Sequence, residues 1–130
     1  IAIPALDDSA LFLWAVDSHL DQAIELMREW GFAYKTVAFV WSKGNRLGLG
    51  KWTRKQCEVC LFGTRGHPRR MSASVRQLID EPRREHSRKP DCVYERIEQL
   101  VAGPYIELFA RTRRPGWDQA FSNEADKFKA

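Results

Sequence analysis

The sequence has no run of about 18 apolar residues, the length that a membrane-spanning helix needs, so we expect no membrane partner. Its first ten residues, IAIPALDDSA, lack the basic start and the long apolar stretch of a secretory signal peptide. Three cysteines are few and odd in number, and they make no disulfide framework. These absences predict a protein of the reducing cytoplasm.

The composition is that of an ordinary globular domain. Hydrophobic residues make up 44% and charged residues 29% of the 130 residues, which is enough apolar surface for one core. Lysine and arginine outnumber aspartate and glutamate by 21 to 17, so the net charge is +4. This balance permits an anionic partner such as nucleic acid but does not require one. We therefore expect residues 1–130 to form a single domain.

Apolar, β-branched stretches alternate along the chain with stretches of helical period. Strands are predicted over residues 11–16, 34–41, 58–62, 74–79 and 105–110. Helices are predicted over residues 20–30 and 91–100, and Asp91 is expected to cap the second. This alternation predicts an α/β fold with a parallel or mostly parallel sheet and covering helices.

In the segment 85–124, many basic and polar residues flank the predicted helix 91–100 and strand 105–110. A basic, polar turn precedes the helix, and arginines and a polar tip follow the strand. Ligands of open α/β sheets bind beyond the carboxyl ends of strands, so this segment is a candidate site for a small charged cofactor. The alternative is a solvated helix start and a basic loop after an edge strand. The candidate cofactor-binding residues are His86, Ser87, Lys89, Arg111, Arg113, Asn123 and Glu124.

A second candidate surface is the loop over residues 41–56. It carries five basic residues, two tryptophans and no acidic residue. Basic residues neutralise phosphates and aromatic rings stack on bases, so the loop is a candidate nucleic-acid contact. The alternative is a solvated loop with two partly buried tryptophans. The candidate substrate-binding residues are Trp41, Lys43, Arg46, Lys51, Trp52, Arg54 and Lys55.

Cys57 and Cys60 have the spacing of a metal-binding pair, but both fall in a predicted strand. Side chains three positions apart in a strand point to opposite faces, so these two thiols cannot share one ion. We therefore expect no metal site.

Seven segments, in this order, resemble a known family. They are LFLW at 11–14, WGFAYKTVAFVWSK at 30–43, CEVCLFGTRG at 57–66, SRKPD at 87–91, IELFAR at 106–111, GW at 116–117 and NE at 123–124. They resemble the adenine-N6 methyltransferases of the messenger-RNA-writer type, which have bacterial and phage DNA-modifying relatives. The resemblance implies a Rossmann-like methyltransferase sheet. It also implies methyl transfer from S-adenosylmethionine to the exocyclic amine of adenine in DNA or RNA. We favour DNA, because the chain shows no additional RNA-binding module.

The resemblance implies roles for single residues. It places Lys89, with His86 and Ser87 beside it, on the carboxylate of the cofactor's amino-acid tail. It places Asn123 and Glu124 on the ribose hydroxyls.

Three further positions are less defined by the resemblance. Arg111 and Arg113 are candidates for the cofactor's carboxylate or for a nucleic-acid phosphate. Ser122 stands where the family usually has glycine, which leaves the placement of the neighbouring Asn123 open.

One expected element is missing. The family's catalytic Asp-Pro-Pro-Trp or Asp-Pro-Pro-Phe element precedes the LFLW strand, and no such tetrapeptide occurs between Ile1 and Ala130. Glu58, where the family has an acidic residue facing the substrate, is the one candidate replacement, and the catalytic residues are otherwise unassigned. We therefore expect the C-terminal portion of the family domain, incomplete at its N-terminus.

Two alternatives keep the same residues but change the function. The first is a non-catalytic, nucleic-acid-binding partner subunit of such a methyltransferase, in a homodimer or a heterodimer. The second is a small basic nucleic-acid-binding protein that has no cofactor.

Overall fold

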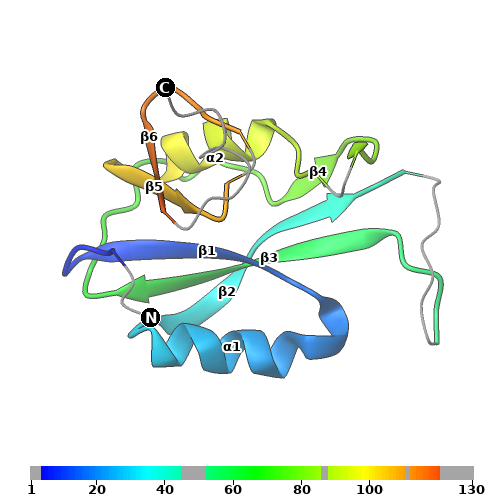
Figure 1. Ribbon diagram of the computed structural model, residues 1–130, viewed down its shortest axis with the longest axis horizontal. Coiled ribbons are helices and arrows are strands. Elements are labelled where there is room, and N and C mark those ends of the chain that lie inside the picture. Colours follow the sequence, from blue (N-terminus) through cyan, green and yellow to red (C-terminus); the bar gives the residue numbers. More distant parts are fainter. Residues whose placement is uncertain (1–3, 45–51, 86–87, 111, 121–130) are drawn as a thin grey trace.

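A four-stranded mixed sheet is the centre of the computed structural model, which describes residues 4–44, 52–85, 88–110 and 112–120 (Figure 1). Its strands lie in the order β1-β3-β2-β4. Their bounds are β1 (Ser9–Ala15), β2 (Ala33–Ser42), β3 (Cys57–Arg65) and β4 (Leu78–Asp80).

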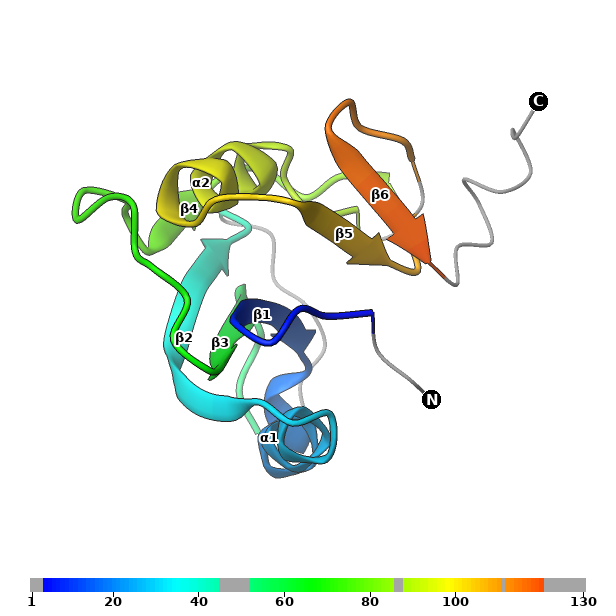
Figure 2. The same cartoon turned by 90° about the vertical axis from the view of Figure 1, so that its left-hand side faces the viewer.

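Two helices lie on opposite faces of this sheet, as Figures 1 and 2 show. A short 3-10 helix, η1 (Asp17–His19), leads into α1 (Leu20–Glu29) on one face. On the other face lies α2 (Cys92–Leu100). After α2, β5 (Tyr105–Leu108) and β6 (Trp117–Ala120) pair in parallel as a second, small sheet. No helix in the described ranges is long and apolar enough to cross a membrane.

The α/β class is confirmed, but the expectation of a parallel or mostly parallel sheet is wrong. β3 runs antiparallel to both of its neighbours, β1 and β2, and β2 and β4 alone form a parallel pair in this sheet. The chain passes from β2 to β3 without a helix in the described part of the connection, and the Lys43 N–H donates a hydrogen bond to the Gln56 carbonyl across its two ends. Such a connection returns the chain antiparallel, whereas a parallel neighbour usually requires a crossover helix.

Alternation along the strands divides the core into two clusters. Phe39 and Trp41 of β2 face α2, where they pack with Ile97. Leu61 of β3 faces α1 and packs with Met27. Because successive side chains of a strand point to opposite faces, the central strands supply apolar residues to both helices.

Most predicted elements are present, with two corrections. The helix at 91–100 forms, but Asp91 makes no side-chain cap. Its carboxylate instead binds Arg84 and Arg88 at 3.1 and 3.5 Å. β6 lies in a segment for which no strand was predicted, and the predicted strand at 74–79 is the shorter β4.

Candidate functional site

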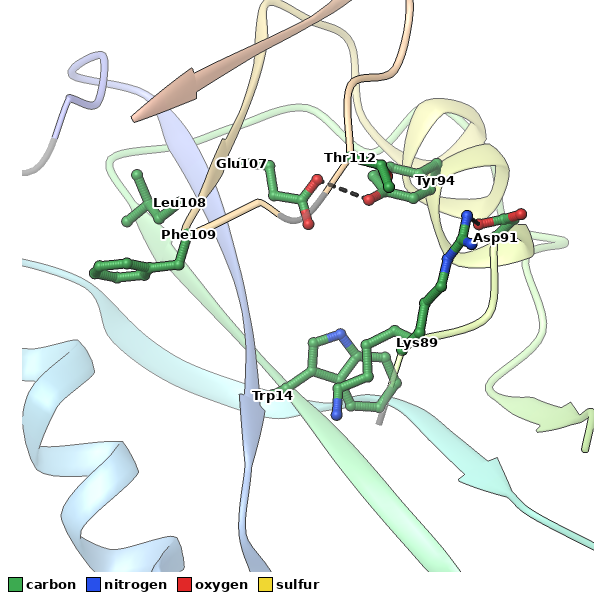
Figure 3. Close-up of a pocket in the computed structure, with 9 residues that line it drawn as sticks. Trp14, Lys89, Asp91, Tyr94, Glu107, Leu108, Phe109 and Thr112 are labelled. Carbon is green, nitrogen blue, oxygen red and sulfur yellow. Dashed lines mark hydrogen bonds and ion pairs between the residues drawn. The ribbon is translucent and has the colours of Figure 1, made fainter. Parts of the chain in front are cut away.

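A cavity of about 250 Å³ lies where the carboxyl ends of β1 and β5 meet the turn before α2 (Figure 3). Trp14 of β1 and Leu108 of β5 line it. This is the position at which ligands bind to open α/β sheets. Its charged lining residues are Arg88, Lys89, Asp91 and Glu107, and its aromatic lining residues are Trp14, Tyr94 and Phe109.

Lys89, the principal candidate for cofactor binding, lines the cavity and also forms an ion pair beneath it. Its Nζ atom lies 2.5 Å from Oε1 of Glu58, and the Nζ atom of Lys43 lies 2.5 Å from Oε2 of the same carboxylate. We call these three residues the Lys43–Glu58–Lys89 cluster. Their sequence motifs indicated three separate roles, in substrate binding, catalysis and cofactor binding, and the fold brings the three residues into contact.

The cluster controls the charge of Glu58. Burial alone would raise the pKa of this carboxyl group, but the hydrogen bonds from Lys43 and Lys89 outweigh burial, and the pKa lies below its usual value. Glu58 therefore stays ionised at neutral pH, and both of its oxygens already accept hydrogen bonds.

Two tryptophans support the cluster. The Lys89 ammonium lies 5.3 Å from the Trp14 ring and 5.8 Å from the Trp41 ring, and the Lys43 ammonium lies 5.3 Å from Trp41. Cation–π attraction of this kind stabilises a desolvated ammonium group. The tryptophans therefore hold Lys89 at the wall of the cavity.

Glu107 and Tyr94 line the cavity, but the sequence analysis did not select them. The Tyr94 hydroxyl donates a 2.7 Å hydrogen bond to Oε1 of Glu107. Burial raises the pKa of Glu107, although the hydrogen bond from Tyr94 acts in the opposite direction. Burial and the neighbouring carboxylate both raise the pKa of Tyr94. Glu107 is a charged residue inside the otherwise apolar run 105–110, and this could have indicated a site residue. Nothing comparable in the sequence indicated Tyr94.

The remaining cofactor candidates are only partly placed. Arg113 is exposed and does not line the cavity. The other candidates lie outside the described residues and stay predictions: His86, Ser87, Arg111, Asn123 and Glu124.

In the predicted nucleic-acid loop, the two tryptophans differ in their exposure to solvent. Trp41 is 0% exposed, and its indole N–H donates a 2.8 Å hydrogen bond to the Glu81 carbonyl. Its ring cannot stack on a base in this arrangement, which corrects the expectation for this residue. Trp52 is 97% exposed, so its ring faces solvent.

The basic residues of this loop also differ in their surroundings. Lys43 is held in the Lys43–Glu58–Lys89 cluster, and Lys55 forms a 2.8 Å ion pair with Asp17 near the surface. Arg54 is exposed, whereas Arg46 and Lys51 lie outside the described residues.

The cysteines show the face alternation that the sequence predicted. Cys57 is exposed, whereas Cys60 is fully buried, and burial raises the pKa of the Cys60 thiol to about 12. Within the described ranges, no three His, Cys, Asp or Glu side chains come together as a metal-binding group.

The lining of the cavity fits part of S-adenosylmethionine. An amino-acid tail carries one carboxylate and one ammonium group, and the cavity presents cations (Arg88, Lys89) and carboxylates (Asp91, Glu107). Ligand pockets for whole drug-sized molecules usually measure about 300–1,000 Å³. The described cavity is therefore large enough for one portion of the cofactor.

Comparison with known proteins identifies the family. The sequence profile of the MT-A70 family matches residues 1–120. The chain belongs to the MT-A70 family. It is 41% identical over 115 residues to the type II methyltransferase M.MunI of Mycoplasma sp., and 32% identical over 127 residues to an N(6)-adenosine-methyltransferase MT-A70-like protein of Arabidopsis thaliana.

Membership of the MT-A70 family confirms the resemblance that the sequence motifs indicated. The two alignments cover 86% and 88% of this chain, but 49% and 18% of the relatives. The chain therefore spans about half the length of M.MunI and a smaller share of the Arabidopsis protein.

Proposed function

We propose that this chain is part of an S-adenosylmethionine-dependent methyltransferase that modifies the exocyclic amine of adenine in DNA. The match of residues 1–120 to the MT-A70 family is the observation that carries the proposal. A cavity with Lys89 in its wall, at the expected ends of β1 and β5, supports it. We propose DNA as the substrate, and the relative that is 41% identical over 115 residues is the type II methyltransferase M.MunI.

The arrangement of β1, α1 and β2 supports a Rossmann-like sheet. β1 and β2 point in the same direction, because both run antiparallel to β3 between them. A helix joins them, as in a strand–helix–strand crossover. We therefore propose that residues 1–130 form part of a methyltransferase domain.

In this proposal, the two sides of the cavity bind the ligand through different residues. Lys89 binds the carboxylate of the amino-acid tail, and Glu107 accepts hydrogen bonds from the ligand on the side that it shares with Tyr94 (Figure 3). When bound, S-adenosylmethionine supplies a methyl group on a sulfonium. The chain's own residues contribute positioning and electrostatic complementarity.

Replacement of Lys89 by alanine is expected to weaken cofactor binding by about 1.5–3 kcal/mol, the range for a hydrogen bond to a charged group. The measurement is titration calorimetry with S-adenosylmethionine on the full-length protein. Lys43→Ala is the matched control, because it removes the other lysine from Glu58 without altering the wall of the cavity. Unchanged affinity in Lys89→Ala, or an equal loss in Lys43→Ala, would remove Lys89 from the cofactor site.

The loop 41–56 is expected to contact nucleic-acid phosphates. Neutralising Arg46, Lys51 and Arg54 together should reduce the salt dependence of DNA binding by roughly 2–3 units of slope. Fluorescence titration of a labelled duplex at several salt concentrations measures this slope.

The control for this experiment is a second triple variant with exposed basic residues of other segments neutralised. The residues replaced are Arg28, Lys35 and Arg76. If both triple variants change the slope equally, the effect comes from net charge alone and the loop has no special role.

The second candidate function is a non-catalytic, nucleic-acid-binding partner subunit. One observation favours it: Lys89 already has a carboxylate partner in Glu58. This function predicts DNA binding without measurable cofactor affinity. The titrations above therefore separate the two candidates.

A further inference from the structure

The hydrogen bond between Tyr94 and Glu107 joins α2 to β5 across one side of the cavity (Figure 3). Both residues line the cavity and both are partly buried. Tyr94 occupies one carboxylate oxygen of Glu107, Oε1. The other oxygen, Oε2, has no hydrogen bond to any residue in the described part of the chain.

The ring of Tyr94 is held from behind by contacts that do not involve the cavity. The Arg114 guanidinium lies 4.9 Å from its centre, and the Trp117 ring packs against it nearly at a right angle, with the two ring centres 5.1 Å apart. Glu98 fixes the positions of Arg114 and Trp117, because its carboxylate accepts hydrogen bonds from Arg114 at 3.2 and 3.3 Å and from the Trp117 indole at 2.7 Å. The position of the Tyr94 hydroxyl is therefore set by packing between α2 and β6, before any ligand is present.

We propose that Tyr94 is a positioning residue, whose hydroxyl holds Oε1 of Glu107 so that Oε2 is presented to an N–H or O–H donor of the cofactor. The inference rests on the proposed function, since it takes the cavity as the cofactor site. A carboxylate with one oxygen fixed by a rigid donor loses little freedom when a ligand binds the other oxygen. Such an orienting role is typical of groups that hold a ligand-binding side chain in a productive geometry.

The same contact should set the pH range of binding. A donor of the ligand binds the ionised carboxylate best, so affinity falls as pH drops through the pKa of Glu107. Burial raises this pKa and the hydrogen bond from Tyr94 lowers it. Loss of the Tyr94 hydroxyl should therefore raise the pKa of Glu107, and the fall in affinity at low pH, which we call the acid limb, should begin at a higher pH. The other charged groups at the cavity are Arg88, Lys89 and Asp91. Arg114 stacks on Tyr94 itself.

The experiment compares Tyr94→Phe, Glu107→Gln and Tyr105→Phe in the full-length protein. Tyr105→Phe is the matched control, because its hydroxyl belongs to the same aromatic cluster but donates to the Val101 carbonyl, away from Glu107. Affinity for S-adenosylhomocysteine is measured by calorimetry across a pH series, and circular dichroism reports folding. Glu107→Gln identifies which part of the fall in affinity at low pH belongs to this carboxyl group.

We expect Tyr94→Phe to bind about 10-fold more weakly, the lower end for a hydrogen bond to a charged group, with its acid limb at higher pH. We expect Tyr105→Phe to retain the affinity and the pH profile of the unsubstituted protein. An unchanged affinity and acid limb in Tyr94→Phe would overturn the proposal, and so would equal effects in Tyr105→Phe. If Tyr94→Phe does not fold, an unchanged affinity and acid limb in Glu107→Gln overturns it instead.

A second ligand identifies the donor. 5′-Methylthioadenosine has the ribose hydroxyls but no amino-acid tail. If its affinity also falls in Tyr94→Phe, Glu107 binds the ribose, and if only S-adenosylhomocysteine is affected, Glu107 binds the ammonium group. If the unsubstituted protein does not bind S-adenosylhomocysteine, the proposed function itself is rejected. If it binds and Tyr94→Phe binds equally well, this inference alone is rejected.

Discussion

Residues 1–130 by themselves are expected to transfer no measurable methyl group to adenine. The adenine amine is a poor nucleophile because its lone pair is delocalised into the ring. In the family that the motifs indicated, the Asp and the first Pro carbonyl of the Asp-Pro-Pro-aromatic element accept its protons, and this chain contains no such element. Loss of preorganised groups of this kind costs factors of about 100–1,000 each.

The structure strengthens this expectation, because the one candidate replacement is already engaged. Both oxygens of Glu58 accept hydrogen bonds from lysines, and its lowered pKa makes it a poorer proton acceptor. To bind an adenine amine, Glu58 would have to release Lys43 or Lys89. A single carboxylate would still lack the second acceptor.

Radiolabelled methyl transfer to adenine-containing oligonucleotides tests the prediction, with the full-length protein assayed beside residues 1–130. Calorimetry with S-adenosylmethionine, run in parallel, separates lost catalysis from lost binding. Robust turnover by residues 1–130 would contradict the prediction. In that case Glu58→Gln should abolish the turnover, since Glu58 would then hold the missing role.

Replacement of Trp41 by alanine is expected to lower the free energy of unfolding by about 3–5 kcal/mol, as for other buried aromatic residues. Its side chain is fully buried and packs against the Trp14 ring, with the two ring centres 6.3 Å apart. Its indole N–H also joins β2 to the segment after β4 through the Glu81 carbonyl. The substitution would leave a cavity and an unpaired carbonyl. It would also remove one of the two rings beneath Lys89, so cofactor affinity should fall together with stability.

Urea unfolding of the full-length protein, followed by far-ultraviolet circular dichroism, measures this effect. Trp52→Ala is the control, because Trp52 is 97% exposed and its loss should change stability by no more than about 0.5 kcal/mol. Similar destabilisation by the two substitutions would show that Trp52 is packed in solution and would contradict the burial that separates them.

The sequence by itself determined the family, the α/β class and the existence of most helices and strands. β-Branched and aromatic residues marked β2 near Trp41, and helical spacing marked α1 and α2, because these patterns depend on neighbours within a few residues. The chemistry of a site is also local when its residues sit beside one element. The motif around Lys89 therefore pointed to the wall of the cavity before any fold was known.

Only the tertiary structure decided how these elements meet. The direction of β3, the burial of Trp41 and the contact of Lys89 with Glu58, 31 positions away, depend on strand pairing across the chain. Strand pairing depends on which apolar faces can be buried together. That information is not contained in any short stretch of the sequence. The hydrogen bond of Tyr94 to Glu107 has the same origin, because α2 and β5 must first pack before their side chains can meet.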